Sequence, residues 1–88
     1  MGNLELAGFI IRSTYRKKVF LLLDNPIRPS EISKKLEIRL THITRELREL
    51  KKRELIECLN PSERVGRLYQ LTHKGKLLKT EMKKKNLL

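Results

Sequence analysis

The chain has little with which to build a catalytic or metal site. Among its 88 residues are one cysteine and two histidines far apart in the sequence, which is fewer ligands than a structural zinc site needs. Asp24 is the only aspartate, and no segment has the pattern of a glycine-rich phosphate loop, an HExxH zinc site or a GxSxG nucleophile turn. We therefore expect no enzyme activity, no bound metal and no cofactor.

Cysteine and long apolar runs are scarce as well. Cys58 alone cannot form a disulfide within the chain, so we expect a reduced, partly buried thiol in the cytoplasm. The longest apolar run, residues 19–23, is far shorter than the roughly 20 residues that cross a membrane. The first residues lack the basic segment, apolar segment and cleavage site of a secretion signal. These absences predict a cytoplasmic protein with no membrane association.

Positive charge is the feature that the chain has in excess. Lysine and arginine number 21 against 10 acidic residues, which gives a formal net charge of +11 at pH 7. Such a surface attracts polyanions, because each phosphate that it neutralises releases condensed counterions. Aromatic residues make up only 5% of the chain, whereas single-stranded RNA is usually bound by stacking on aromatic rings. Duplex DNA is therefore the favoured partner, with RNA as an alternative.

The first part of the chain predicts two helices within a single domain, residues 1–88. Residues 1–12 form an N-terminal arm that we leave open as a short strand, a helical lead-in or a dimerisation segment. Ser13 is a good N-cap for a helix that ends before Pro26, because proline disfavours helical backbone in the preceding residue. Ser30 is the expected N-cap of a short second helix that ends near Glu37.

The second half predicts a long helix, a hairpin and a final helix. Residues 39–53 have helical periodicity, residues 55–59 and 67–72 suit two strands, and the polar segment between them forms a loop. Thr72 is the expected N-cap of a basic C-terminal helix within residues 73–88. The order predicts an α+β fold of the winged helix-turn-helix type, with three helices, a β-hairpin wing at residues 60–67 and a C-terminal helix.

The long helix has an apolar and a basic side. Ile43, Leu47 and Leu50 form its buried stripe, and Leu77, Leu78 and Met82 form the apolar face of the last helix. An α-helix fits the major groove, where arginine bonds guanine and threonine contacts base edges or a thymine methyl. The candidate DNA contacts of the long helix are Arg39, Leu40, Thr41, His42, Thr44, Arg45, Arg48 and Lys52.

Four further basic residues are candidate DNA contacts. Lys34 and Lys35 belong to the short preceding helix, which lies across the DNA backbone in a helix-turn-helix, so phosphate contact suits them. Arg64 and Arg67 flank Gly66, which permits a tight turn with positive φ, and an arginine of a wing can enter the minor groove. The simpler alternative for all of these residues is a solvated surface.

The glutamates of the long helix support that simpler alternative in part. Arg45 and Glu49, and likewise Glu49 and Arg53, have the i,i+4 spacing of surface ion pairs. However, Glu46 and Glu49 fall off the line that joins Thr41, Arg45 and Arg48. This separation favours a binding face.

Residues 13–78 resemble the winged-helix transcriptional regulators of archaea, which are related in fold to the ArsR and MarR repressors. The resemblance is carried by SxxRxxVxxLL from Ser13, by PSEISKKLEIRLTHITRELRELKKRELIE, and by ECLNPSERVGRLYQLTHKGK. It implies a DNA-binding regulator, usually a homodimer, here through its N-terminal and C-terminal segments. By position, it implies base reading by Arg39, Leu40, Thr41, Thr44, Arg45 and Arg48. Glu37 departs from the pattern, because the turn of a helix-turn-helix often has glycine there.

Two other uses of the fold stay open beside DNA recognition. A winged helix that contacts proteins would have an exposed apolar patch and no duplex affinity above that of any basic protein. An RNA-binding module is the other alternative. Neither the target sequence nor an effector follows from these residues.

Overall fold

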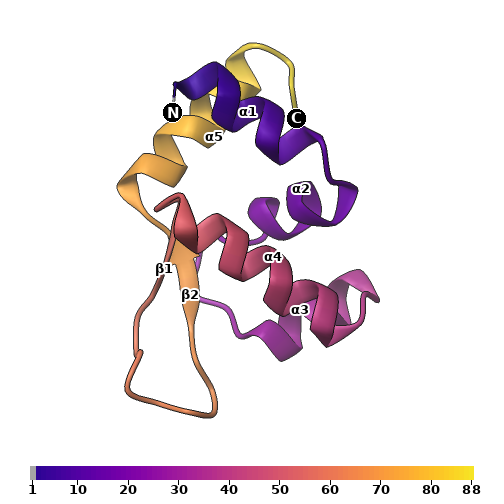
Figure 1. Cartoon of the computed structure of the whole chain (residues 1–88), viewed down its shortest axis with the longest axis vertical. Coiled ribbons are helices and arrows are strands. Elements are labelled where there is room, and N and C mark those ends of the chain that lie inside the picture. Colours follow the sequence, from indigo (N-terminus) through magenta and orange to yellow (C-terminus); the bar gives the residue numbers. More distant parts are fainter. Residues whose placement is uncertain (1) are drawn as a thin grey trace.

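The computed structural model describes residues 2–88, which form five helices and one two-stranded antiparallel sheet (Figure 1). In chain order the elements are α1 (Asn3–Ile11), α2 (Thr14–Leu21), α3 (Pro29–Leu36), α4 (Leu40–Lys52), β1 (Ile56–Cys58), β2 (Tyr69–Leu71) and α5 (His73–Lys84). This order confirms the α+β winged-helix prediction, with α3 and α4 as the helix-turn-helix pair. None of the described helices has the length and apolar character needed to cross a membrane.

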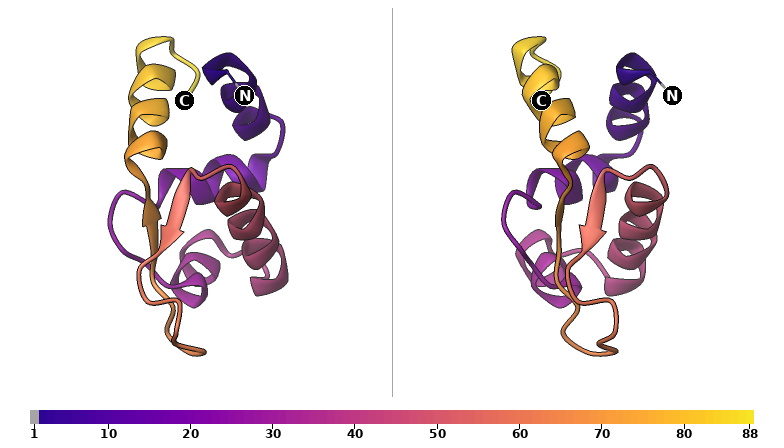
Figure 2. Two further views of the ribbon diagram at one scale, coloured as in Figure 1. Left: turned by 60° about the vertical axis from the view of Figure 1, so that its left-hand side comes forward. Right: turned by 90° about the vertical axis from the view of Figure 1, so that its left-hand side faces the viewer.

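The N-terminal arm is helical, which excludes the short strand among the alternatives that its sequence left open, while a role in dimerisation stays a prediction. Met1 lies outside the described residues. α1 buries Leu6, Ala7, Phe9 and Ile10 and packs against α2 and α5. Figure 2 shows α1 and α5 at one end of the molecule, with both chain termini, and the hairpin loop projecting at the opposite end. The loop of the hairpin therefore lies far from the two terminal helices.

Two of the three predicted helix caps are confirmed. The hydroxyls of Ser13 and Thr72 each accept a hydrogen bond from the backbone N–H three residues further on, at 3.2 and 3.1 Å. The prediction for Ser30 is wrong, because α3 begins at Pro29 and Arg28 is its N-cap. Proline suits the first helical position, since the N–H that it lacks would have no partner inside the helix.

The hairpin is shorter than predicted, with three residues in each strand. Its register pairs Ile56 with Leu71 and Cys58 with Tyr69. A further bridge, which the sequence did not indicate, joins Ile27 to Tyr69 through reciprocal backbone hydrogen bonds of 3.0 Å. This bridge attaches the segment before α3 directly to the wing.

The core contains buried side chains from every helix and both strands. The predicted stripe of α4 is confirmed, because Ile43, Leu47 and Leu50 are all buried. On α5, Leu78 and Met82 are buried as expected. The prediction that Leu77 shares their face is wrong, since 57% of its surface is exposed; it follows Lys76 on the outer side of the helix.

Candidate nucleic-acid interface

The side of α4 opposite its buried stripe is a basic ridge, formed by Thr41, Arg45, Arg48 and Lys52. All four side chains are exposed, and they follow one another at steps of four, three and four residues, which places them on one line along the helix. Arg39, at the N-cap of α4, is exposed at the start of the helix. The ridge thus presents three cations along a helix whose diameter suits the major groove.

One flank of the ridge faces α1 and α2. His42 lies on this flank, with its ring centroid 5.3 Å from that of Tyr15, so the structure separates it from the other candidate contacts of α4. Glu46 is buried on the same flank, and its Oε1 lies 2.9 Å from Nε of Arg16. The simpler alternative of a solvated face therefore does not hold for Glu46. Its Oε2 lies 3.9 Å from Nε of Arg45.

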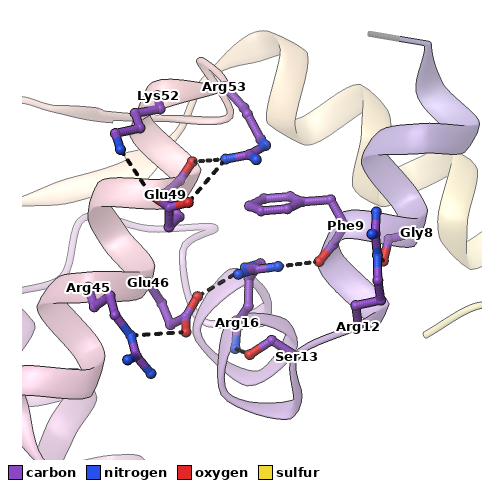
Figure 3. Close-up of polar contacts among 10 residues, drawn as sticks. All are labelled: Gly8, Phe9, Arg12, Ser13, Arg16, Arg45, Glu46, Glu49, Lys52 and Arg53. Carbon is purple, nitrogen blue, oxygen red and sulfur yellow. Dashed lines mark hydrogen bonds and ion pairs between the residues drawn. The ribbon is translucent and has the colours of Figure 1, made fainter.

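A ring between two guanidinium groups fixes this flank (Figure 3). The central guanidinium carbons of Arg16 and Arg53 lie 3.8 and 3.6 Å from the ring centroid of Phe9. Arg16 also donates a 2.7 Å hydrogen bond to the carbonyl of Phe9, and Arg53 donates a 3.1 Å bond to the carbonyl of Glu49. Charges on α4 and α2 thereby hold the aromatic side chain of α1, and they set the position of α4 against the N-terminal helices.

Glu49 lies at the end of the flank and interacts with two cations. Its carboxylate is 3.2 Å from Lys52 Nζ and 3.6 Å from Arg53 Nη1, which confirms the expected pair with Arg53. The hydrogen bond and charge of Lys52 are the main cause of a pKa of Glu49 below its ordinary value. Lys52 is thus partly neutralised by its own helix, whereas Arg48 forms no ion pair within residues 2–88.

The other flank of α4 faces the wing across two adjoining surface hollows, of about 450 and 320 Å³. We call the larger one the wing hollow. It is lined by Arg28, Pro29, Ser30, Leu40, Thr44, Arg64, Val65, Gly66, Arg67 and Tyr69. The smaller one shares Pro29, Thr44, Arg67 and Tyr69 and adds Leu47, Arg48 and Lys51. The structure thus brings the predicted residues Leu40, Thr44 and Arg48 together with both wing arginines.

Asn60 organises the loop of the wing. Its Oδ1 accepts a 2.8 Å hydrogen bond from the N–H of Leu68, and its Nδ2 donates a 3.1 Å bond to the carbonyl of Gly66. Gly66 has φ of 74°, so the prediction of a left-handed turn there is confirmed. These bonds close the loop on itself and give it a defined shape.

The two wing arginines differ in their surroundings. Arg67 donates through Nε to the carbonyl of Glu63 at 2.6 Å and through Nη2 to that of Pro61 at 3.2 Å, so its side chain is part of the loop. Arg64 is exposed at the tip beside Val65, which is itself 88% exposed. Of the two wing arginines, only Arg64 leaves its guanidinium free of the loop carbonyls.

The helix-turn-helix turn keeps the left-handed conformation that glycine often adopts there, although this sequence has Glu37. Glu37 is left-handed, with φ of 55° and ψ of 42°, at the position where glycine is common. Lys34 and Lys35 are exposed in the last turn of α3 and lie outside the wing hollow. Within residues 2–88, no three histidine, cysteine or acidic side chains are grouped to hold a metal ion, and Cys58 is partly buried with a free thiol.

Sequence reasoning missed Arg28, Lys51 and Tyr69, which line the two hollows. Lys51 could have been predicted from the sequence, because Leu40, Thr44 and Lys51 are spaced by four and seven residues and so share one side of α4. Arg28 and Tyr69 are brought to the site by the bridge between Ile27 and Tyr69, for which the sequence has no local signal.

Solved structures of several proteins share this fold. The quinone-bound YodB from B. subtilis matches with a TM-score of 0.75 and 25% identity, over 94% of this chain and 90% of YodB. The reduced form of the transcriptional regulator YodB from B. subtilis matches with a TM-score of 0.77 and 22% identity, over 98% of this chain and 87% of YodB. Streptococcus pneumoniae FabT in complex with DNA matches with a TM-score of 0.66 and 26% identity, over 82% of this chain and 52% of FabT.

No family model and no curated protein sequence matches the chain. The similarity to the solved structures shows that the chain has the fold of winged-helix transcriptional regulators. An archaeal origin and a specific place beside ArsR or MarR stay predictions.

Proposed function

We propose that this protein is a sequence-specific transcriptional regulator that binds duplex DNA with α4 in the major groove. The observation that carries the proposal is the division of charge on α4: its carboxylates face α1 and α2, and its ridge is basic. The fold shared with FabT, whose structure is of a complex with DNA, supports the same partner. No catalytic step belongs to this function.

The residues of the ridge and its N-terminal end take the base-reading roles. We expect Arg45 and Arg48 to bond guanine, and Thr41 to contact a base edge or a thymine methyl. Arg39 lies at the end of α4 that enters a groove first in a helix-turn-helix. Leu40 and Thr44, on the side of the wing hollow, contact the DNA where the helix faces the wing.

The remaining candidates take positioning roles. Lys34 and Lys35 bind phosphates from α3, and Lys52, already beside Glu49, reaches the backbone at the far end of the ridge. Arg64 enters the minor groove from the wing tip. His42, against Tyr15, supports the flank of α4 rather than contacting bases.

A homodimer through α1 and α5 is part of the proposal. These helices form the end of the molecule opposite the wing (Figure 2), and they expose Leu4, Ile11 and Leu77 at 79%, 42% and 57%. Covering such side chains favours association. A two-fold dimer would read two half-sites about one helical turn apart. The cytoplasm suits such a regulator and its reduced thiol.

Selection from a random duplex pool, with mass measured in solution, tests the function. We expect an enriched palindromic motif and the mass of a dimer. Arg45→Ala should lower affinity for the selected duplex by about 5- to 150-fold and relax the preference at one base pair, as for loss of a bidentate base contact. The control is Lys83→Ala, which removes the same charge from an exposed position of α5 on a different side of the helix from Leu77.

Two results would contradict the proposal. Full affinity in Arg45→Ala would exclude α4 as the reading helix. A selection with no enriched motif, together with duplex affinity no higher than that of any basic protein, would instead favour a winged helix that contacts proteins.

A further inference from the structure

Arg28 occupies a position that the fold, rather than the local sequence, creates. The preceding residue, Ile27, exchanges two 3.0 Å backbone hydrogen bonds with Tyr69 of β2, and α3 starts at the following residue, Pro29. Arg28 itself is extended, with φ of −88° and ψ of 149°. Its backbone is therefore held between the wing strand and the first turn of α3.

The side chain of Arg28 crosses from α3 to the turn of the wing. A Cβ built on Gly66 would lie 3.7 Å from its Nε and 3.9 Å from its Nη2, so the guanidinium rests against the left-handed turn. These distances are ordinary van der Waals contacts, so a Cβ at position 66 would not displace the arginine. Glycine is favoured there by the positive φ of the turn.

The charges around the wing hollow are all of one sign. Arg28, Arg64 and Arg67 line it, and none of its lining residues, all within the described part of the chain, is acidic. Arg67 has two of its N–H groups on carbonyls of the loop, whereas Arg28 forms no ion pair within residues 2–88. Three guanidiniums around one concavity favour an anion, and arginine binds phosphate oxygens with two parallel hydrogen bonds.

Resting on the proposed function, we infer that the wing hollow is a binding site for a DNA backbone phosphate and that Arg28 is its principal ligand. Leu40 and Thr44 of α4 form the opposite wall, so the site lies beside the base-reading ridge and not beneath it. A phosphate bound there joins α3, α4 and the wing to one DNA strand. The contact fixes the register of the protein on the duplex and carries no base preference.

The test compares the salt dependence of duplex binding for the full chain and its variants. Arg28→Gln should weaken binding about equally for the selected duplex and for unrelated duplexes, and reduce the slope of log affinity against log salt by about 1. Arg28→Lys keeps the charge but loses the two parallel N–H donors of the guanidinium. Its salt slope should therefore stay near that of the wild type while its affinity falls. Lys83→Gln, the charge-matched control on a side of α5 away from Leu77, should leave the slope unchanged.

Each other outcome has a defined meaning. Unchanged slope and affinity in Arg28→Gln, while Arg45→Ala behaves as expected, would overturn this inference alone. Altered base preference in Arg28→Gln, or a slope that falls equally in Arg28→Lys, would also overturn it, since the residue would then act by reading bases or by shaping the wing. A wild-type chain without salt-dependent duplex binding would instead refute the proposed function, and the phosphate site with it.

Discussion

Replacing Gly75 by alanine tests the close contact between α5 and the start of the wing. Gly75 is buried in the first turn of α5, and a Cβ there would lie 2.1 Å from the carbonyl oxygen of Leu55. That oxygen already accepts a 3.0 Å hydrogen bond from the N–H of Thr72, which limits its freedom to move. Gly8, in the middle of α1, offers a matched control, since a Cβ there would meet nothing within 4 Å.

The two alanine substitutions should have opposite signs. In a helix, alanine is more favourable than glycine by about 1 kcal/mol, and this gain is available at both positions. At Gly75 the new contact must open by more than 1 Å to reach ordinary packing, which shifts backbone against backbone. Overpacking of this kind costs about 1–3 kcal/mol, and loss of the hydrogen bond to Leu55 adds about 1 kcal/mol. The net expectation is a loss of about 1–3 kcal/mol for Gly75→Ala and a gain of up to about 1 kcal/mol for Gly8→Ala.

Urea unfolding followed by circular dichroism measures both free energies directly. In a domain of this size, each kcal/mol corresponds to about 4–8 °C in the melting temperature, so thermal melts provide a second readout. Stabilisation of similar size in both variants would refute the reasoning. It would mean that the approach of α5 to Leu55 is looser than the structure shows.

Three further substitutions test other parts of the fold. Phe9→Leu removes the ring held between two guanidiniums and should lower the free energy of unfolding by about 1–3 kcal/mol in urea titrations. Thr72→Ala removes the cap of α5 and should cost about 0.5–2 kcal/mol, most of which Thr72→Ser should restore. Hydrogen bonds from Lys85 and Asn3 hold the pKa of Glu81 below its ordinary 4.5, so its stabilisation is present above that pH and is lost as pH falls through the folded value. Across this pH range, the melting temperature should depend less steeply on pH in Glu81→Gln than in the wild type. Equal pH dependence in the two proteins would exclude the contribution of Glu81.

The elements that the sequence predicted correctly are those with local signals. Ser13 and Thr72 cap the helices that follow them, and the stripe of α4 follows from spacing alone. The failures occur where contacts distant in sequence decide. Ser30 is a good cap in isolation. However, the bridge at Ile27 keeps the backbone extended through Arg28, and α3 begins at the next residue, Pro29.

The candidate site was predictable to the same degree. The ridge follows from the helical period, whereas the wing hollow depends on segments that only the folded chain brings together. Arg28 carried no pattern that marked it, because its partner surface is the turn at Gly66. The helical period places Glu46 beside the buried stripe, three residues from Ile43 and four from Leu50, but it cannot reveal its partner, Arg16 on another helix.

The flank of α4 explains why the ridge can stay basic without weakening the fold. A buried ion pair such as that of Glu46 and Arg16 adds little net stability, but removal of either partner leaves an uncompensated charge, so the pair strongly disfavours other arrangements. A rotation of α4 by one residue, about 100°, would separate Glu46 from Arg16 and withdraw Arg53 from the ring of Phe9. The same rotation would turn the ridge away from the groove. The charges that hold α4 in place are therefore distinct from those that it presents to DNA, and the first set fixes the orientation of the second.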